Sequence, residues 1–222
     1  MRKILETLKR KWTEYLLEII VIIIGILGAF TLNNWNENRL NKDEVDGYLG
    51  QIKDELTLDI VKYNYDLKVS STAIEYLNKV SSEKYDEVDL SILLHYLSNN
   101  LSPRTFGTSY NKLLESGNAE LTVDVQINSS LQRYYLEACT RYNGVTEYHQ
   151  KFVSENIEGP LITILNHKRG YLVDPKEVIE KMEKGALRSM INWQINYFEY
   201  YQPRIEINIK QAEELIEIIN SR

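Results

Sequence analysis

The chain has 222 residues, of which 43% are hydrophobic and 26% charged, and its formal net charge is −6. This acidic balance argues against nucleic-acid binding, which depends on a positively charged surface. The one cysteine, Cys139, excludes an internal disulfide. We interpret it as a small buried side chain, with an intermolecular disulfide as the alternative.

Positive charge is concentrated at the N-terminus. Residues 1–15 contain five Lys and Arg against two Glu, whereas residues 36–222 contain 21 Lys and Arg against 29 Asp and Glu. The positive-inside rule therefore predicts a cytoplasmic basic tip at 1–15 and an extracytoplasmic domain at 36–222. In a bacterial protein the anchor would lie in the inner membrane and the extracytoplasmic domain in the periplasm. The basic tip can contact anionic lipid headgroups.

Residues 16–35, LLEIIVIIIGILGAFTLNNW, are predicted to form a transmembrane helix. At 1.5 Å per residue they span about 30 Å, the thickness of a bilayer core. Trp12 and Tyr15 flank one end and Trp35 the other, as in an aromatic belt. A soluble core helix and a cleaved secretory signal are the alternatives. The unbroken isoleucine and valine run argues against the first, and the lack of a clear cleavage site against the second.

Two features inside this span indicate contacts with another helix. Glu18 either reaches the headgroups or pairs with a basic residue of a partner span. Gly25 and Ala29 are four residues apart, which places two small side chains on one face and permits close helix approach. The expected partners are the lipid bilayer and either a membrane protein or a second copy of the chain.

The sequence of the anchor resembles that of a known protein family. The segments Tyr15–Ile20, Gly25–Phe30 and Asn33–Glu37 resemble the N-terminal signature of a family of uncharacterised bacterial single-pass membrane proteins, a domain of unknown function. YNKLLESGN at 110–118 and LQRYY at 131–135 are similar to its middle portion. The resemblance implies one N-terminal span and a helical remainder. It implies no activity and no catalytic residues.

Beyond the span, helical periodicity continues to about Val80. Apolar residues recur in steps of three and four and predict one core-facing stripe: Val45, Leu49, Ile52, Leu56, Ile60, Tyr63, Leu67, Ile74 and Leu77. Gly47 and Gly50 interrupt the stripe, and they indicate either close helix packing or a hinge. The stripe is expected to end near Ser81 to Lys84.

Shorter elements are expected next. Asp86 is the predicted cap of a helix that ends before Ser102-Pro103, and Thr108 is the predicted cap of a helix that ends at Ser116-Gly117-Asn118. Residues 121–127 alternate apolar and polar side chains, which predicts an extended connector, with 162–165 and 171–173 as conceivable pairing partners.

Two longer helices complete the prediction. The first begins at Asn128 or Ser129 and is broken at Gly159-Pro160. Asp174-Pro175-Lys176-Glu177 has the residues of a helix start. The last helix runs from Leu187 to Ile219 and is expected to be kinked at Pro203.

The predicted fold class is therefore all-α: a transmembrane helix that continues into an antiparallel helical bundle. Stripes of this length could also pair between chains as a coiled coil, although Pro203 and the glycine pairs argue against one regular rod.

The sequence gives no motif for chemistry. His95, His149 and His167 lack the spacing of a metal site, and no catalytic or phosphate-binding motif is present, so no metal, cofactor or catalytic residue is predicted. One cluster has two interpretations, a tyrosine-rich edge of the core or a partner surface near Pro203. Its residues are Trp193, Tyr197, Tyr200 and Tyr201, beside Phe198.

We therefore expect a non-enzymatic, single-pass membrane protein with a periplasmic helical interaction or structural module. The alternative is a helical ligand-sensing domain that signals through a membrane partner.

Overall fold

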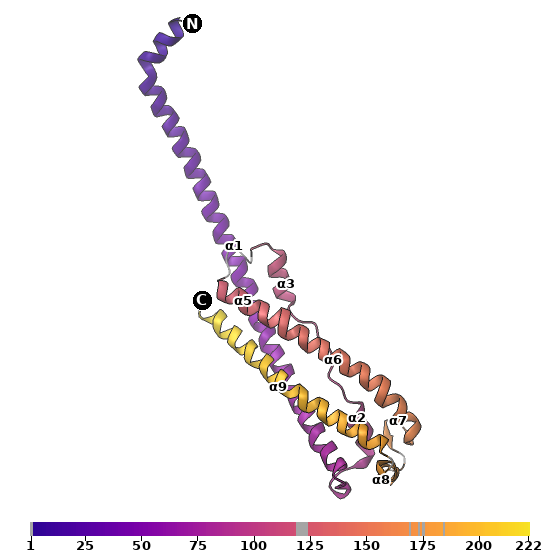
Figure 1. Cartoon of the computed structure of the whole chain (residues 1–222). Coiled ribbons are helices and arrows are strands. Elements are labelled where there is room, and N and C mark those ends of the chain that lie inside the picture. The colour runs from indigo at the N-terminus through magenta and orange to yellow at the C-terminus, as the bar shows by residue number, and fades with distance from the viewer. Residues whose placement is uncertain (1, 119–123, 169, 173, 175, 184) are drawn as a thin grey trace. The chain divides into compact units, whose positions relative to one another are not determined.

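The computed structural model describes residues 2–118, 124–168, 170–172, 174, 176–183 and 185–222, with 2–11 and 183 described by their backbone alone. Helices dominate, so the all-α class is confirmed (Figure 1). The chain divides into two compact units, Met1–Gly47 and Tyr48–Arg222. A single helix, α1 (Arg2–Ser81), contributes to both, which confirms that the apolar stretch continues as helix to about residue 80.

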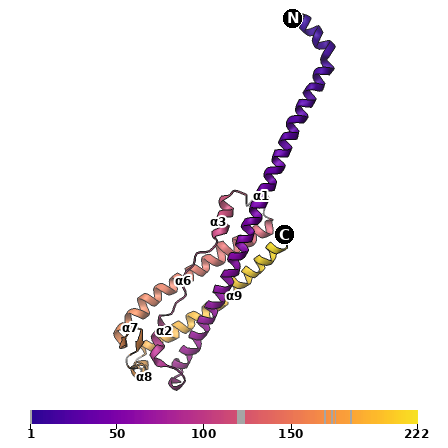
Figure 2. The same ribbon diagram turned by 180° about the vertical axis from the view of Figure 1, so that it is seen from behind.

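In the second unit, three long helical stretches lie side by side (Figures 1 and 2). The first is α1 from residue 48 onward, and the last is α9 (Ala186–Asn220). The middle stretch consists of successive helical segments with two π-helical parts, η3 and η4. They are α5 (Val125–Gln132), η3 (Arg133–Cys139), α6 (Thr140–Phe152), η4 (Val153–Glu158) and α7 (Gly159–Ile164).

Hydrogen bonds between the stretches give their directions. Asp59 pairs with Tyr134 and Asp66 with Tyr142, so α1 and the middle stretch run parallel. Lys53 pairs with Asn220 at the C-terminal end of α9, and Ser81 pairs with Asn192 near its N-terminal end, so α9 runs antiparallel to α1. Antiparallel neighbours were expected throughout. The parallel pair arises because the segment after α1 carries the chain back before α5 begins.

This return segment packs along α1 in the reverse direction. Tyr76 bonds to the backbone oxygen of Asp89, and the nitrogen of Ser109 bonds to Glu55. Its elements are η1 (Tyr85–Glu87), η2 (Leu90–Ile92), α2 (Leu93–Ser98) and α3 (Thr108–Glu115). Asp89 caps η2 by accepting from the Ser91 nitrogen at 2.9 Å, so the predicted capping role of Asp86 is wrong.

Helix α3 begins differently from its prediction. Gly107, in the left-handed conformation, precedes it, and no side chain caps it, so Thr108 is not the cap. Its expected end is confirmed, because Gly117 has a φ of 72° just after the helix.

The extended connector predicted at 121–127 is wrong where it can be compared. Residues 121–123 lie outside the described residues. Asp124 caps α5 by accepting from the Gln126 nitrogen at 2.7 Å, and helix begins at Val125 rather than at Asn128 or Ser129. A capping carboxylate satisfies an otherwise unpaired backbone donor, and this local effect overrides a short alternation.

Residues 167–183 form a hairpin and a helix. Strand β1 (His167–Lys168) pairs antiparallel with β2 (Tyr171–Leu172). Helix α8 (Lys176–Glu183) follows, and Asp174 accepts from the Lys176 nitrogen at 3.0 Å, which confirms the predicted start.

The break predicted at Gly159-Pro160 is wrong, because Pro160 lies in the first turn of α7. The π-helical segment η4 comes directly before this turn, where a proline needs no helical donor. Pro203 lies inside α9, as predicted, and helix continues on both sides. The predicted kink at this residue stays a prediction.

The core of the second unit lies along two stripes whose buried positions alternate in steps of three and four. On α1 they are Leu49, Ile52, Leu56, Asp59, Tyr63, Asp66, Ser70, Ala73, Leu77 and Val80. On α9 they are Leu187, Ile191, Gln194, Phe198, Tyr201, Ile205, Asn208, Ala212 and Leu215. Each fully buried aliphatic or aromatic side chain contributes about 1.5–3 kcal/mol. Polar side chains occupy the middle of both stripes.

Candidate functional sites: an apolar anchor and an aromatic groove

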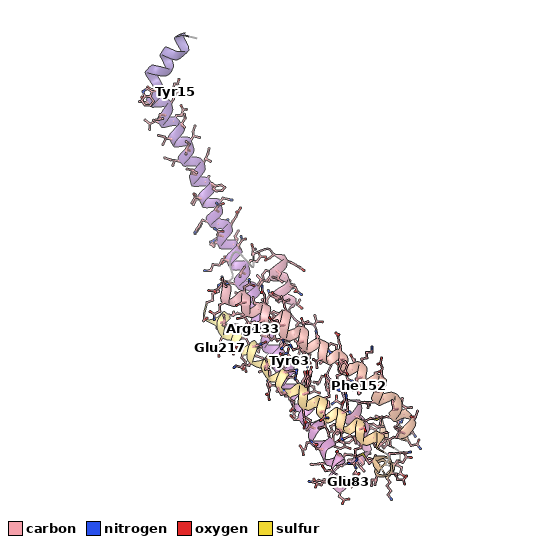
Figure 3. The ribbon with its side chains drawn as sticks, in the orientation of Figure 1. Tyr15, Tyr63, Glu83, Arg133, Phe152 and Glu217 are labelled. Atoms are coloured by element: carbon pink, nitrogen blue, oxygen red, sulfur yellow. The ribbon has the colours of Figure 1, made fainter. Side chains whose placement is uncertain are left out.

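The predicted anchor is an exposed apolar helix. From Leu16 to Leu32 its large hydrophobic side chains are between 43% and 67% exposed. Figure 3 shows them projecting from the N-terminal part of α1, where Tyr15 is labelled. Within the described residues one helix is long and apolar enough to cross a membrane, and no residue of its most apolar window is buried.

The anchor residues singled out from the sequence all lie on α1. Trp12 and Trp35 are 59% and 63% exposed, and the guanidinium of Arg39 lies 5.7 Å from the Trp35 ring centroid. A Cβ atom built on Gly25 would meet nothing within 4 Å, so this face is open to a second helix. The roles of Glu18 and of the Gly25 and Ala29 face stay predictions.

The aromatic cluster on α9 does not form one surface. Tyr200 is 54% exposed and Trp193 is half-buried, whereas Tyr201 is 1% exposed and lies in the core. Successive residues of a helix point about 100° apart, so neighbours such as Tyr200 and Tyr201 face different directions. The partner-surface interpretation is therefore wrong for Tyr201, and Tyr197 is only 8% exposed.

Stacked rings join α6 to α9 beneath this surface. Phe152 stacks on Trp193 with ring centroids 3.5 Å apart and planes 12° apart. His149 stacks on Tyr197 at 3.6 Å and 19°, and the Tyr197 hydroxyl donates to the backbone oxygen of Val145 at 2.7 Å. These contacts leave Trp193 and Tyr197 little freedom to turn.

Above the stacked rings, an open groove of about 470 Å³ runs between α6 and α9. Helix α6 contributes Gly144, Val145 and Tyr148 to its lining, and α9 contributes Trp193, Asn196, Tyr197 and Tyr200. Tyr148 is 61% exposed. The sequence did not indicate the α6 half of this groove, because residues 144–148 are adjacent to α9 only in the folded chain.

His149 lies buried below the groove. Its Nε2 is 3.0 Å from Gln194 Oε1, and Gln194 Nε2 donates to the backbone oxygen of Asn99 at 2.6 Å. Because the Gln194 oxygen must accept, His149 carries its proton on Nε2. Nδ1 finds no hydrogen-bond partner among the described residues. Burial lowers the pKa of His149 to about 4, so the ring is neutral at pH 7.

Two buried carboxylates hold α1 to the middle stretch. The Tyr134 hydroxyl donates to Asp59 at 3.0 Å, and Tyr142 donates to Asp66 at 2.8 Å. Arg104 donates to Asp66 at 2.6 Å, completing a partly buried ion pair. Desolvation raises the pKa of both carboxyl groups. The sequence contained a usable signal for them, because Asp59 and Asp66 continue the steps of three and four along the apolar stripe.

Cys139 lies beside this network. It is 3% exposed, and burial raises the pKa of its thiol to about 12. The buried interpretation is confirmed, and a thiol so enclosed cannot reach a second chain without unfolding. Asn208 of α9 donates to the Tyr63 hydroxyl at 3.3 Å.

A second open cleft, of about 650 Å³, lies among α2, α7 and the hairpin. His95, Glu158, His167 and Tyr171 are among its lining residues. Among the described residues, no group of three or more His, Cys, Asp or Glu is arranged to hold a metal ion.

Comparison with known proteins identifies the family. The model of DUF6090, a family of unknown function, matches residues 18–183, which is more than half of the chain. The chain belongs to DUF6090. The DUF6090 match begins inside the apolar part of α1 and ends with α8, so it includes the α6 side of the groove. No curated protein and no solved structure matches the chain.

Proposed function

We propose that this DUF6090 protein is a non-enzymatic single-pass protein of the bacterial inner membrane, with residues 16–35 as its anchor. The observation that carries the proposal is the exposed apolar surface of α1, because water-soluble proteins do not leave so long a run of isoleucine, leucine and valine uncovered. The length of the run suits a bilayer.

The charge distribution supports one orientation. Residues 1–15 carry a formal net charge of +3, from five basic and two acidic side chains, so they stay in the cytoplasm. Residues 36–222 are then periplasmic.

The periplasmic part acts as an interaction or structural module. Long stripes with buried positions three and four residues apart are the geometry from which coiled-coil-like bundles are built. The Gly25 and Ala29 face supports pairing of the span with a membrane protein or a second copy.

Orientation is tested with a reporter fused after Arg222. Alkaline phosphatase, which is active only outside the cytoplasm, should be active in this fusion, and a cytoplasmic reporter should be inactive. In a matched variant, the basic residues Arg2, Lys3, Lys9, Arg10 and Lys11 are changed to Gln, and phosphatase activity should fall. Activity of the cytoplasmic reporter in the unmodified chain would contradict the orientation.

Anchoring is tested by alkaline extraction of membranes. The unmodified chain should remain in the membrane pellet, whereas Ile22→Lys combined with Ile26→Lys should release it, because each centrally placed Lys costs about 2.5–3.5 kcal/mol. Leu58→Lys with Val61→Lys is the control, since both residues are exposed on α1 outside the span. Full release of the unmodified chain would contradict anchoring.

Pairing through the span is tested by crosslinking in mild detergent. Gly25→Leu with Ala29→Leu should abolish a crosslinked species, because bulky side chains prevent close helix approach. Leu27→Met, on the opposite side of the helix, should leave it unchanged.

The groove between α6 and α9 favours a second function, a ligand-sensing domain that signals through a membrane partner. Its volume of about 470 Å³ lies within the usual range of small-molecule sites, roughly 300–1,000 Å³.

A further inference from the structure

We propose that the groove between α6 and α9 binds a small planar aromatic ring that bears a carboxylate group. This inference rests on the second function proposed above and names its ligand class. Three features of the molecule support it: the stacked rings, the glycine in the lining and the position of Arg204.

The walls of the groove are suited to a flat ring. Phe152 supports Trp193 from one side, and His149 supports Tyr197 in the same way. The Trp193 and Tyr197 rings are themselves only 20° from parallel, with centroids 5.5 Å apart. Tyr148 and Tyr200 add exposed rings from the two helices. Rings already held in place bind another ring at a low entropic cost.

A glycine keeps the groove open on the α6 side. Gly144 lies inside α6, where glycine is less favourable than alanine by about 1 kcal/mol. A Cβ atom built on Gly144 would meet nothing within 4 Å, so packing within the chain does not require a glycine there. The space it leaves belongs to the groove.

Arg204 does not itself line the groove, but it packs on Tyr200, which does, and through this position it sets the charge of the ligand. Its guanidinium lies 3.4 Å from the Tyr200 ring centroid and donates to the Tyr200 backbone oxygen at 2.5 Å. No carboxylate of the described residues forms an ion pair with it. A cationic ligand would be repelled by this guanidinium, which already covers one face of Tyr200, whereas a carboxylate would gain a charge-assisted partner.

The remaining polar groups can orient the ligand. Asn196 lines the groove with an amide that both donates and accepts hydrogen bonds. The accessible rings of Tyr148, Trp193 and Tyr200, one amide and a nearby guanidinium are the groups that would recognise an aromatic carboxylate.

The experiment uses the full chain in mild detergent and ¹⁹F NMR of three probes of the same shape: 4-fluorophenylacetate, its neutral primary amide and cationic 4-fluorophenethylamine. The anion should bind saturably, about tenfold more tightly than the amide, and the cation most weakly. Detergent micelles without protein show how much signal comes from partition into the micelle.

Variants assign the binding to the groove. Gly144→Leu places a side chain in the groove, with its Cβ atom clear of other atoms within 4 Å, and should abolish binding of all three probes. Arg204→Gln should remove the preference for the anion and keep binding of the amide. Tyr65→Ala is the matched control, because Tyr65 is 66% exposed on α1 and does not line the groove. Circular dichroism shows that each variant is folded.

The outcomes separate this proposal from the others. Absence of saturable binding, binding unchanged by Gly144→Leu, or tightest binding of the cation would each overturn the ligand class. These results would leave the topology and extraction experiments unaffected. A cytoplasmic reporter active at Arg222 would overturn the orientation and leave the probe measurements standing.

Discussion

The hydroxyl of Tyr134 donates a 3.0 Å hydrogen bond to the carboxylate of Asp59, and both side chains are buried between α1 and η3. Desolvation raises the pKa of Asp59, and the hydrogen bond from Tyr134 opposes that shift. The Tyr134 hydroxyl and the ammonium group of Lys62, 3.9 Å from the Asp59 carboxylate, together favour the charged form of Asp59 at this position. A buried polar pair of this kind fixes which residues of two helices lie opposite each other.

Tyr134→Phe should destabilise the protein by about 1–3 kcal/mol, because it leaves the buried Asp59 carboxylate without its hydroxyl partner. The measurement is urea-induced unfolding of the full chain in detergent, followed by circular dichroism. Asp59→Asn added to Tyr134→Phe should recover part of the loss. Tyr65→Phe, at an exposed position, is the control. An unchanged urea midpoint in Tyr134→Phe would contradict this expectation and show that water takes over the hydrogen bond to Asp59.

Arg104→Gln should cost about 3 kcal/mol, since it leaves the buried Asp66 carboxylate without a positive partner. Tyr142 still donates to Asp66, which keeps the loss at the lower end of the range for buried pairs. A double-mutant cycle with Asp66→Asn measures the coupling. Lys151→Gln removes an exposed pair with Glu155 and should cost less than about 1 kcal/mol. An equal loss of stability in Arg104→Gln and Lys151→Gln would contradict the conclusion that the Arg104–Asp66 pair is buried and stabilising.

His149 should make stability fall as the solution is acidified from about pH 6.5 towards pH 4. The folded-state pKa of about 4 lies below the ordinary 6.5, so the unfolded chain binds the proton first. The stabilisation is fully present above 6.5 and is lost as pH falls, by on the order of 3 kcal/mol in total.

The pH dependence is measured from unfolding midpoints of the full chain and of His149→Gln, which should lose this slope. Asp59 and Asp66, with raised pKa values, act in the opposite sense, because the folded chain takes up their protons first on acidification. The difference between the two proteins therefore isolates the histidine. The same slope in His149→Gln would assign the effect to other groups.

Two glycines should respond oppositely to alanine. Gly107 has a φ of 71°, and a Cβ atom there would lie 2.9 Å from the Tyr135 ring. Gly107→Ala should destabilise by about 1–2 kcal/mol or more. Gly144→Ala should stabilise by about 1 kcal/mol, because its Cβ meets nothing and helix propensity improves. Thermal unfolding measures both, and a shift in the same direction would contradict the local backbone described here.

Local signals in the sequence predicted the helical elements well. The Asp174 cap and part of the buried stripe on α1, including Leu49, Leu56 and Leu77, could be predicted because helix period and capping depend on residues close in sequence. The prediction was wrong for Ile60, Leu67 and Ile74, which are only half-buried, because their neighbours Asp59, Asp66 and Ala73 face the core instead. Asp124 is also a local capping signal, but the prediction treated it as part of a short alternation of apolar and polar residues.

Only the α9 side of the groove could be predicted from the sequence. Trp193, Tyr197 and Tyr200 are close in sequence on α9, whereas Gly144 and Tyr148 come from a helix some fifty residues earlier. Which neighbour of the Tyr200 and Tyr201 pair faces outward depends on how α9 is rotated against α1 and α6. That rotation is set by packing between helices, which no local pattern contains.

By itself, the sequence determined a basic N-terminus, a long apolar helix and a helical remainder, because charge and hydrophobic periodicity are properties of neighbouring residues. Only the tertiary structure decided that α1 and the middle stretch run parallel, that Pro160 lies in a helix, and that Asp59, Asp66 and His149 are buried with partners. These features depend on residues far apart in the chain. Burial of a charge is tolerated only when such a distant partner reaches it.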